Sequence, residues 1–194
     1  MQKDNKRVSH LKKAAVLCLT ALAMNVSAQS IRHYETQVND FKLLRSASLA
    51  KYTQQIDQQY NLHTPYNEDF IFVNKDRTAH LRLIHHPGDG KYQMAGFEVR
   101  KGMPDADESY YSTLSDKTFI TNNGTMLGLS EQDIINIQGK PQEIIQEGDY
   151  KVFYYAETEA KSSFLQQYNE AEYVIEYWFL NGTLTRFNFG FIYP

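Results

Sequence analysis

The stretch YVIEYWFLNGTLTRFNFGF, residues 173–191, is the part of the sequence that most strongly decides the fold. Two runs rich in aromatic and β-branched residues, Tyr173–Leu180 and Thr183–Phe191, are separated by Asn181-Gly182. Asn-Gly is the pair preferred in a type I′ turn, because both central residues of that turn need positive φ. The stretch therefore predicts an antiparallel hairpin with a two-residue loop.

The same loop predicts how the two strands pair. Counting outward from the turn sets Leu180 opposite Thr183, Phe179 opposite Leu184 and Trp178 opposite Thr185. Because side chains alternate along a strand, this pairing puts apolar residues on both faces. One face holds Ile175, Tyr177, Phe179 and Leu184, and the other holds Val174, Trp178, Leu180, Phe187 and Phe189. A sheet with one hydrated side does not account for such a hairpin.

Two explanations of the second apolar face remain open. Either the N-terminal half of the chain covers it, which is the commoner case for aromatic stripes, or it is a partner surface. Aromatic side chains often anchor protein interfaces, so the second explanation makes the hairpin aromatics candidates for partner contact. The candidates are Trp178, Tyr177, Phe187 and Phe189.

The segment Leu127–Pro141 has the start and stop signals of a short helix. Ser130 is a natural N-cap, and Asp133, three residues later, predicts the reciprocal hydrogen bonds of a capping box. Gly139 suits the left-handed position after the helix, and Pro141 prevents its continuation. A helix of about two turns does not persist alone, so we expect its isoleucines to pack on a sheet.

Upstream, the sequence predicts a helix followed by an antiparallel meander. Residues 35–60 place apolar side chains at helical spacing, and turns rich in Asn, Asp, Pro and Gly separate the runs that follow. The predicted strands cover residues 70–73, 79–85, 92–100, 119–121, 143–146 and 150–156. Polar stretches at residues 101–116 and 157–167 are expected to be connections.

The first 28 residues have the layout of a secretory signal peptide. Five basic residues precede a short apolar core, and Asn25-Val26-Ser27-Ala28 supplies small residues at the two positions that signal peptidase reads. We expect cleavage after Ala28 and export to the periplasm or beyond. The apolar core is too short for a stop-transfer helix. Val16-Leu17 before Cys18 do not form a lipobox. Neither a membrane span nor a lipid anchor is predicted.

Composition argues against several kinds of partner. The whole chain has 20 basic and 23 acidic residues, and the part after residue 28 has 15 and 22, for a net charge of −7. Such an acidic chain suits neither nucleic acid nor an anionic membrane surface. The only cysteine, Cys18, would leave with the signal peptide. Disulfides, thiol nucleophiles and thiolate metal sites are therefore not expected.

Three short motifs, Gly128-Leu129-Ser130, Gly139-Lys140-Pro141 and Phe179-Leu180-Asn181-Gly182, follow a family pattern. Over about residues 124–194 the chain resembles the SmpA/OmlA family of small BamE-like outer-membrane assembly lipoproteins, and the wider β-lactamase-inhibitor-protein-like (BLIP-like) fold. In that family a capped helix start is followed by Gly-x-Pro and an antiparallel hairpin with an Asn-Gly turn. The resemblance implies a non-enzymatic envelope protein that binds other proteins.

The chain is thus expected to comprise a signal peptide at residues 1–28, an N-terminal α+β segment at 29–120 and a SmpA/BamE-like domain at 121–194. Tyr66-Asn67-Glu68 and Tyr168-Asn169-Glu170 each precede a strand, which leaves open that the N-terminal segment is a degenerate repeat. The expected fold class is α+β, with an antiparallel sheet, made of the meander and the C-terminal hairpin, and short helices packed on one face.

Candidate catalytic and metal-binding residues are few. The candidates for a metal site are His80, His85, His86 and Asp89. Zinc needs three or four converging ligands, and a polar strand edge running into a turn explains these residues better. The acidic candidates are Asp105, Asp107 and Glu108, without the spacing of an EF-hand loop, and Glu143, Glu147 and Asp149, whose separation the sequence does not fix.

No nucleophile elbow, zinc-protease motif, P-loop or dinucleotide fingerprint occurs in the sequence. We therefore assign no catalytic residue, cofactor or metal, and we expect protein binding in the cell envelope. The alternative is a secreted inhibitor of a hydrolase, which the wider fold resemblance suggests. A hydrolase is the least favoured hypothesis, because it would require carboxylates or histidines to converge in a pocket.

Overall fold

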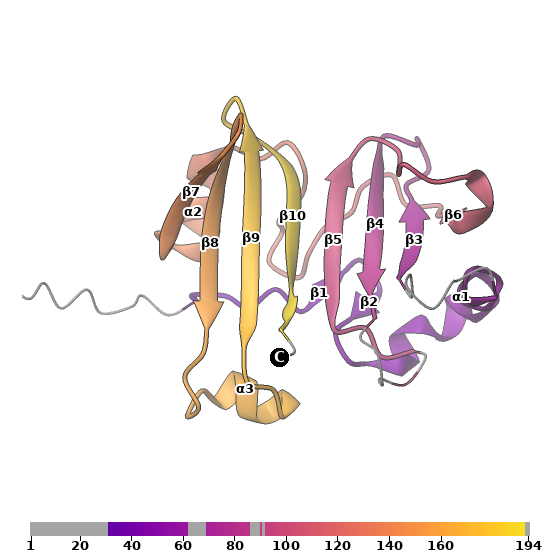
Figure 1. The fold of residues 1–194 in the computed structure, drawn as a ribbon, viewed down its shortest axis with the longest axis horizontal. Helices are drawn as coiled ribbons and strands as arrows, with labels where there is room; N and C mark the ends of the chain where they lie inside the picture. The colour runs from indigo at the N-terminus through magenta and orange to yellow at the C-terminus, as the bar shows by residue number, and fades with distance from the viewer. Residues whose placement is uncertain (1–30, 62–68, 86–89, 91, 193–194) are drawn as a thin grey trace, which may run out of the picture.

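Eight strands drawn from both halves of the chain form one continuous sheet in the computed structural model (Figure 1). The structure describes residues 31–61, 69–85, 90 and 92–192. The strands lie in the order β6-β3-β4-β5-β10-β9-β8-β7. Their bounds are β3 Phe70–Val73, β4 Ala79–Ile84, β5 Gly96–Lys101, β6 Tyr111–Thr113, β7 Glu143–Glu147, β8 Tyr150–Glu157, β9 Tyr173–Leu180 and β10 Thr183–Phe191. The predicted α+β class is confirmed, but the sheet is mixed, because β3 and β6 are parallel.

Short helices and a small second ladder accompany the sheet. They are β1 Gln37–Val38, β2 Phe41–Lys42, η1 Ser46–Tyr52, α1 Thr53–Tyr60, η2 Glu108–Tyr110, α2 Glu131–Gln138 and α3 Ser163–Tyr168. In Figure 1, α2 and the N-terminal segment leading to β1 lie behind the sheet, and α3 lies at its lower end. Within the described ranges, no helix has the length and apolar character needed to cross a bilayer.

The two halves of the chain meet where β5 pairs with β10, a seam that runs from Arg100↔Arg186 to Gly96↔Gly190. The backbones approach closely at its far end. A Cβ at Gly190 would lie 2.5 Å from both the carbonyl oxygen of Ala95 and the Cα of Gly96. This end of the seam therefore requires glycine at position 190.

The hairpin predicted from residues 173–191 is confirmed at its turn. Asn181 and Gly182 have φ values of 51° and 75°, as a type I′ turn requires. Leu180 pairs with Thr183 as predicted, but Trp178 pairs with Arg186 and not with Thr185. The ladder shifts register between Leu184 and Arg186, so Thr185 is the extra residue of a β-bulge.

This bulge makes the prediction of two apolar faces wrong. One extra residue shifts the alternation of all later side chains by one position. Phe187 now pairs with Tyr177, and Phe189 pairs with Ile175, so these residues share one face. The aromatic and aliphatic side chains that this face buries are Tyr173, Ile175, Tyr177, Phe179, Leu184, Phe187, Phe189 and Phe191. We call it the covered face.

The capped helix is confirmed as α2. The Ser130 hydroxyl accepts a hydrogen bond from the backbone N–H of Asp133, whose carboxylate accepts one from the backbone N–H of Ser130. Gly139 ends the helix with a φ of 86°. Ile134 is fully buried in the core cluster, in agreement with the expectation that packing holds this helix.

The helix predicted over residues 35–60 is wrong in its first part. The structure has β1 and β2 there, and helical backbone starts only with η1. Asn39 and Leu44 have φ values of 48° and 50°, which no right-handed helix contains. The Asn39 side chain bonds the carbonyl of Thr118 and the N–H of Ile120, so a distant loop fixes this turn.

The structure differs from the sequence predictions at several other places. β6 and α3 form inside the two stretches expected to be connections, and residues 119–121 contribute only an isolated bridge, from Thr121 to Val38. The strand predicted at residues 92–100 begins only at Gly96. The predicted signal peptide and the Tyr66-Asn67-Glu68 motif lie outside the described residues.

Candidate binding site on the open sheet face

The second face of the sheet, which we call the open face, carries side chains in rows across the strands. One row runs through His80, Arg100, Arg186, Trp178 and Val152, on β4, β5, β10, β9 and β8. The next runs through Arg82, Glu98, Asn188, Glu176 and Tyr154. In Figure 1, α2 lies behind the sheet, on the side of the covered face. The open face is therefore turned toward the viewer, and no described helix crosses it.

Trp178, the only tryptophan of the chain, is half-buried on the open face, near the turn between β9 and β10. The Arg186 guanidinium lies 4.5 Å from its ring centroid, and the Tyr150 ring meets it edge-on at 6.0 Å. Arg186 Nη2 also lies 2.7 Å from Glu98 Oε2, and the indole N–H donates to Glu176 Oε2 at 3.1 Å. These contacts fix the orientation of both the indole and the guanidinium.

A hollow of about 270 Å³ lies beside Trp178, and we call it the Trp178 hollow. Its lining residues are Arg100, Lys101, Tyr150, Trp178, Leu180, Thr185 and Arg186. Three of these residues, Arg100, Lys101 and Arg186, are cationic, and none of the described lining residues is acidic. The hollow therefore combines positive charge with aromatic and aliphatic surface.

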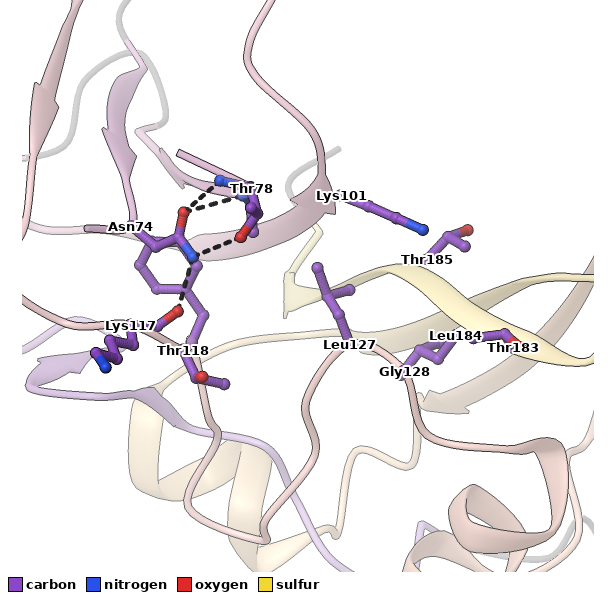
Figure 2. A pocket seen from close by; sticks show the side chains of 12 residues that line it. Asn74, Thr78, Lys101, Lys117, Thr118, Leu127, Gly128, Thr183, Leu184 and Thr185 are labelled. Atoms are coloured by element: carbon purple, nitrogen blue, oxygen red, sulfur yellow. Dashed lines mark hydrogen bonds between the residues drawn. The ribbon is translucent and has the colours of Figure 1, made fainter. Parts of the chain in front are cut away.

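A second hollow of about 280 Å³, the junction pocket, shares Lys101 and Thr185 with the first (Figure 2). It lies where β5 ends at Lys101. There β10 pairs instead with the loop before α2: Gly128 N–H donates to the Leu184 carbonyl at 2.9 Å, and Leu184 N–H donates to the Leu129 carbonyl at 2.8 Å. The bulge at Thr185 lies where β10 changes its pairing from β5 to the loop before α2. The junction pocket occupies the gap between β5 and this loop.

Hydrogen bonds already occupy the main polar group in the wall of the junction pocket. The Asn74 amide donates to Thr78 Oγ1 at 3.0 Å and to the Lys117 carbonyl at 2.7 Å, as Figure 2 shows. Its oxygen accepts from the backbone N–H groups of Thr78 and Ala79. Among the described residues that line the pocket, the titratable side chains are Lys101 and Lys117. This part of the lining therefore offers no acid–base pair.

A buried acid, Glu35, lies on the covered face and connects the N-terminal segment to the sheet. Its Oε1 accepts hydrogen bonds from Thr125 at 2.7 Å, Tyr177 at 3.1 Å and Gln138 at 3.3 Å, and its Oε2 accepts one from Asn123 at 3.0 Å. Burial raises the pKa of Glu35, although the hydrogen bonds from Thr125, Tyr177 and Gln138 act in the opposite direction. Glu35 is fully buried, and its hydrogen bonds join the N-terminal segment to α2 and β9.

Of the four aromatic residues predicted as partner contacts, only Trp178 lies at the surface. Tyr177, Phe187 and Phe189 are at most 2% exposed, because the bulge turns both phenylalanines toward the covered face. The prediction is corrected for these three, which belong to the core. Partner contact by Trp178 stays a prediction.

The candidate metal ligands are not brought together. His80 is buried, with Nδ1 2.9 Å from the Gly102 carbonyl, and burial lowers its pKa. His85 follows the end of β4, whereas His86 and Asp89 lie outside the described residues. Across the described ranges, no three His, Cys, Asp or Glu residues are grouped as a metal ion would need.

The candidate acids are also separated. Glu108 pairs with Arg77 at the surface. Glu143 and Glu147 lie at opposite ends of β7, four residues and thus about 13 Å apart. Glu143 and Glu147 are therefore too far apart to form the close carboxylate pair of a retaining glycoside hydrolase. Asp105, Asp107 and Asp149 are exposed.

The lining residues of the Trp178 hollow other than Trp178 itself were not found from the sequence. One signal could have revealed them: Leu184 and Phe187 are three residues apart, and this interrupts the period of two kept by Phe187, Phe189 and Phe191. Such an interruption indicates a bulge. A bulge at Thr185 would have put Arg186 beside Trp178.

Comparison with known proteins gives no matching family model, no matching curated protein and no matching solved structure.

Proposed function

We propose that this chain is a non-catalytic binding protein of the cell envelope and that it contacts a partner protein through its open sheet face. The observation that carries the proposal is the position of Trp178. A large aromatic side chain, held by Arg186 and Glu176, lies half-buried on a face that no described helix covers. Tryptophan and arginine are the residues most often found as energetic anchors of interfaces.

The rest of the site supports binding over catalysis. The acids near Trp178 are engaged, Glu98 by Arg186 and Glu176 by the indole. Of the other candidate acids, Glu108 is paired with Arg77, and Glu143 and Glu147 lie at opposite ends of β7. A rigid row of aromatic and charged side chains suits recognition, because little ordering remains to be done when a partner binds.

The test is affinity capture from an envelope extract with three tagged forms of the chain: the wild type, Trp178→Ala and Ile144→Ala. Ile144 is exposed on β7 at the far edge of the sheet and serves as the matched control. We expect the wild type and the control to retain the same protein, and Trp178→Ala to bind it about 30-fold more weakly, as loss of an interface anchor does.

Thermal unfolding of each variant checks that the fold is intact, and Tyr150→Ala replaces Trp178→Ala if the latter unfolds. Capture that does not depend on either residue, or no capture at all, would count against the proposal. If the captured protein is a hydrolase, an activity assay with the purified chain tests the inhibitor hypothesis.

A further inference from the structure

We infer that the Trp178 hollow binds a carboxylate group presented by an acidic segment of the partner protein. This inference rests on the proposed function and adds the chemistry of the group that the open face recognises. It is carried by charge: three cations gather around one hollow in a chain whose net charge is negative.

Two of the three cations have no counter-charge. Arg100 and Lys101 are both exposed, and within the described part of the chain neither has an ion pair or a side-chain hydrogen bond. The third, Arg186, is paired with Glu98; its Nε has no hydrogen-bond partner among the described residues but is buried, so the accessible unpaired donors are those of Arg100 and Lys101. The hollow therefore keeps unused donors and uncompensated positive charge.

Of the neighbouring charges on the open face, that of Arg82 is compensated, because its guanidinium donates to Asp69 at 2.6 Å. Glu176 accepts a hydrogen bond from the neutral indole N–H and keeps its negative charge. The excess of positive charge is thus local to the end of β5 and the start of β10. A carboxylate is the group that arginine and lysine can bind there by charge-assisted hydrogen bonds.

The lining of the hollow suits a glutamate side chain, and its volume of about 270 Å³ has room for one. Trp178, Tyr150 and Leu180 supply apolar surface on one side, which suits the aliphatic stem of a glutamate. The rows of the open face continue beyond the hollow, where the rest of the partner would lie.

The test uses the indole N–H of Trp178, which gives a single indole signal in a nitrogen–proton correlation spectrum. A capped tetraglutamate peptide is titrated into the ¹⁵N-labelled chain, with capped tetraglutamine as the uncharged analogue and inorganic phosphate as a competing anion. We expect a saturable shift of the indole signal with tetraglutamate only. We also expect this binding to weaken when salt is raised.

Arg100→Gln and Lys101→Gln are each expected to weaken tetraglutamate binding about tenfold, the effect of losing one charge-assisted bond. Lys161→Gln, which removes the same charge from an exposed position at the opposite end of β8, should leave it unchanged. Equal shifts with both peptides, or no shift with tetraglutamate, would overturn the inference. Tighter binding of phosphate than of tetraglutamate would overturn it in favour of a phosphate site.

The two proposals can fail separately. If a captured partner depends on Trp178 but not on Arg100 or Lys101, the carboxylate inference fails and the binding function stands. If tetraglutamate binds as expected but capture is independent of Trp178, the hollow recognises carboxylates and the proposed function fails.

Discussion

Glu35 shows how a single buried charge can make the whole fold sensitive to pH. The ordinary pKa of a glutamate is about 4.3, and burial raises it in the folded chain. The folded state therefore holds this proton more tightly than the unfolded state does. The resulting stabilisation is complete below about pH 4.3 and is lost as the pH rises through the raised pKa.

We expect Glu35→Gln to remove this dependence, because an amide does not titrate. Over the interval above about pH 4.3, the stability of the wild type relative to Glu35→Gln should fall by up to about 1.4 kcal/mol per pH unit. Urea denaturation from about pH 4 to about pH 8 measures it. Glu147→Gln, an exposed change on β7, is the control. A constant difference between wild type and Glu35→Gln at all pH values would contradict the prediction.

At the scale of single elements, we expect the bulge in β10 to matter for the binding site and not for the stability of the fold. Removal of Thr185 would leave Leu184 opposite Phe179 and Arg186 opposite Trp178, in a regular ladder with every side chain on its present face. We expect this deletion to change the free energy of unfolding by less than about 1 kcal/mol. Because Thr185 borders both hollows, the deletion should weaken tetraglutamate binding.

The matched comparison is insertion of one alanine between Arg186 and Phe187. This insertion moves three core phenylalanines to the open face, and it should cost more than about 4 kcal/mol of stability or prevent folding. Urea denaturation compares the two variants. Similar losses of stability in both would show that the bulge serves the fold.

The elements differ in how far their own sequence predicts them. The type I′ turn at Asn181-Gly182 and the cap of α2 at Ser130 are local, because the residues that require the geometry are adjacent or three apart. β6 depends on a distant segment, because it forms by pairing with the edge of β3, which lies about 40 residues earlier in the chain. The first part of the predicted helix at residues 35–60 fails for the same reason, since the loop near Ile120 fixes Asn39.

The candidate site also combines a residue that the local sequence indicates with residues that distant pairing brings together. Trp178 was predictable from the aromatic hairpin, whereas its neighbours depend on the bulge and on the pairing of β5 with β10. Arg100 and Arg186 are 86 residues apart in the sequence and become direct partners only through that pairing. No local pattern near Arg100 indicates this contact.

At the scale of the whole molecule, the seam between β5 and β10 is the step on which the eight-stranded sheet depends. We expect Gly190→Ala to destabilise the chain by about 1–3 kcal/mol, because the added Cβ would collide with the backbone at Ala95 and Gly96. Gly96→Ala, whose Cβ would lie 3.2 Å from the Phe189 carbonyl oxygen, should cost less. Urea denaturation of both variants checks the order, and a larger loss for Gly96→Ala would contradict it.

The seam also governs the order of events during folding. The residues of β10 that pair with β5 are synthesised 86 to 94 residues later, so this edge of β5 stays unpaired while the intervening chain is produced. Pairings between such distant segments form slowly, and an open strand edge is a place where a nascent chain aggregates or where a chaperone can bind. Folding of this chain should therefore be limited by closure of its sheet.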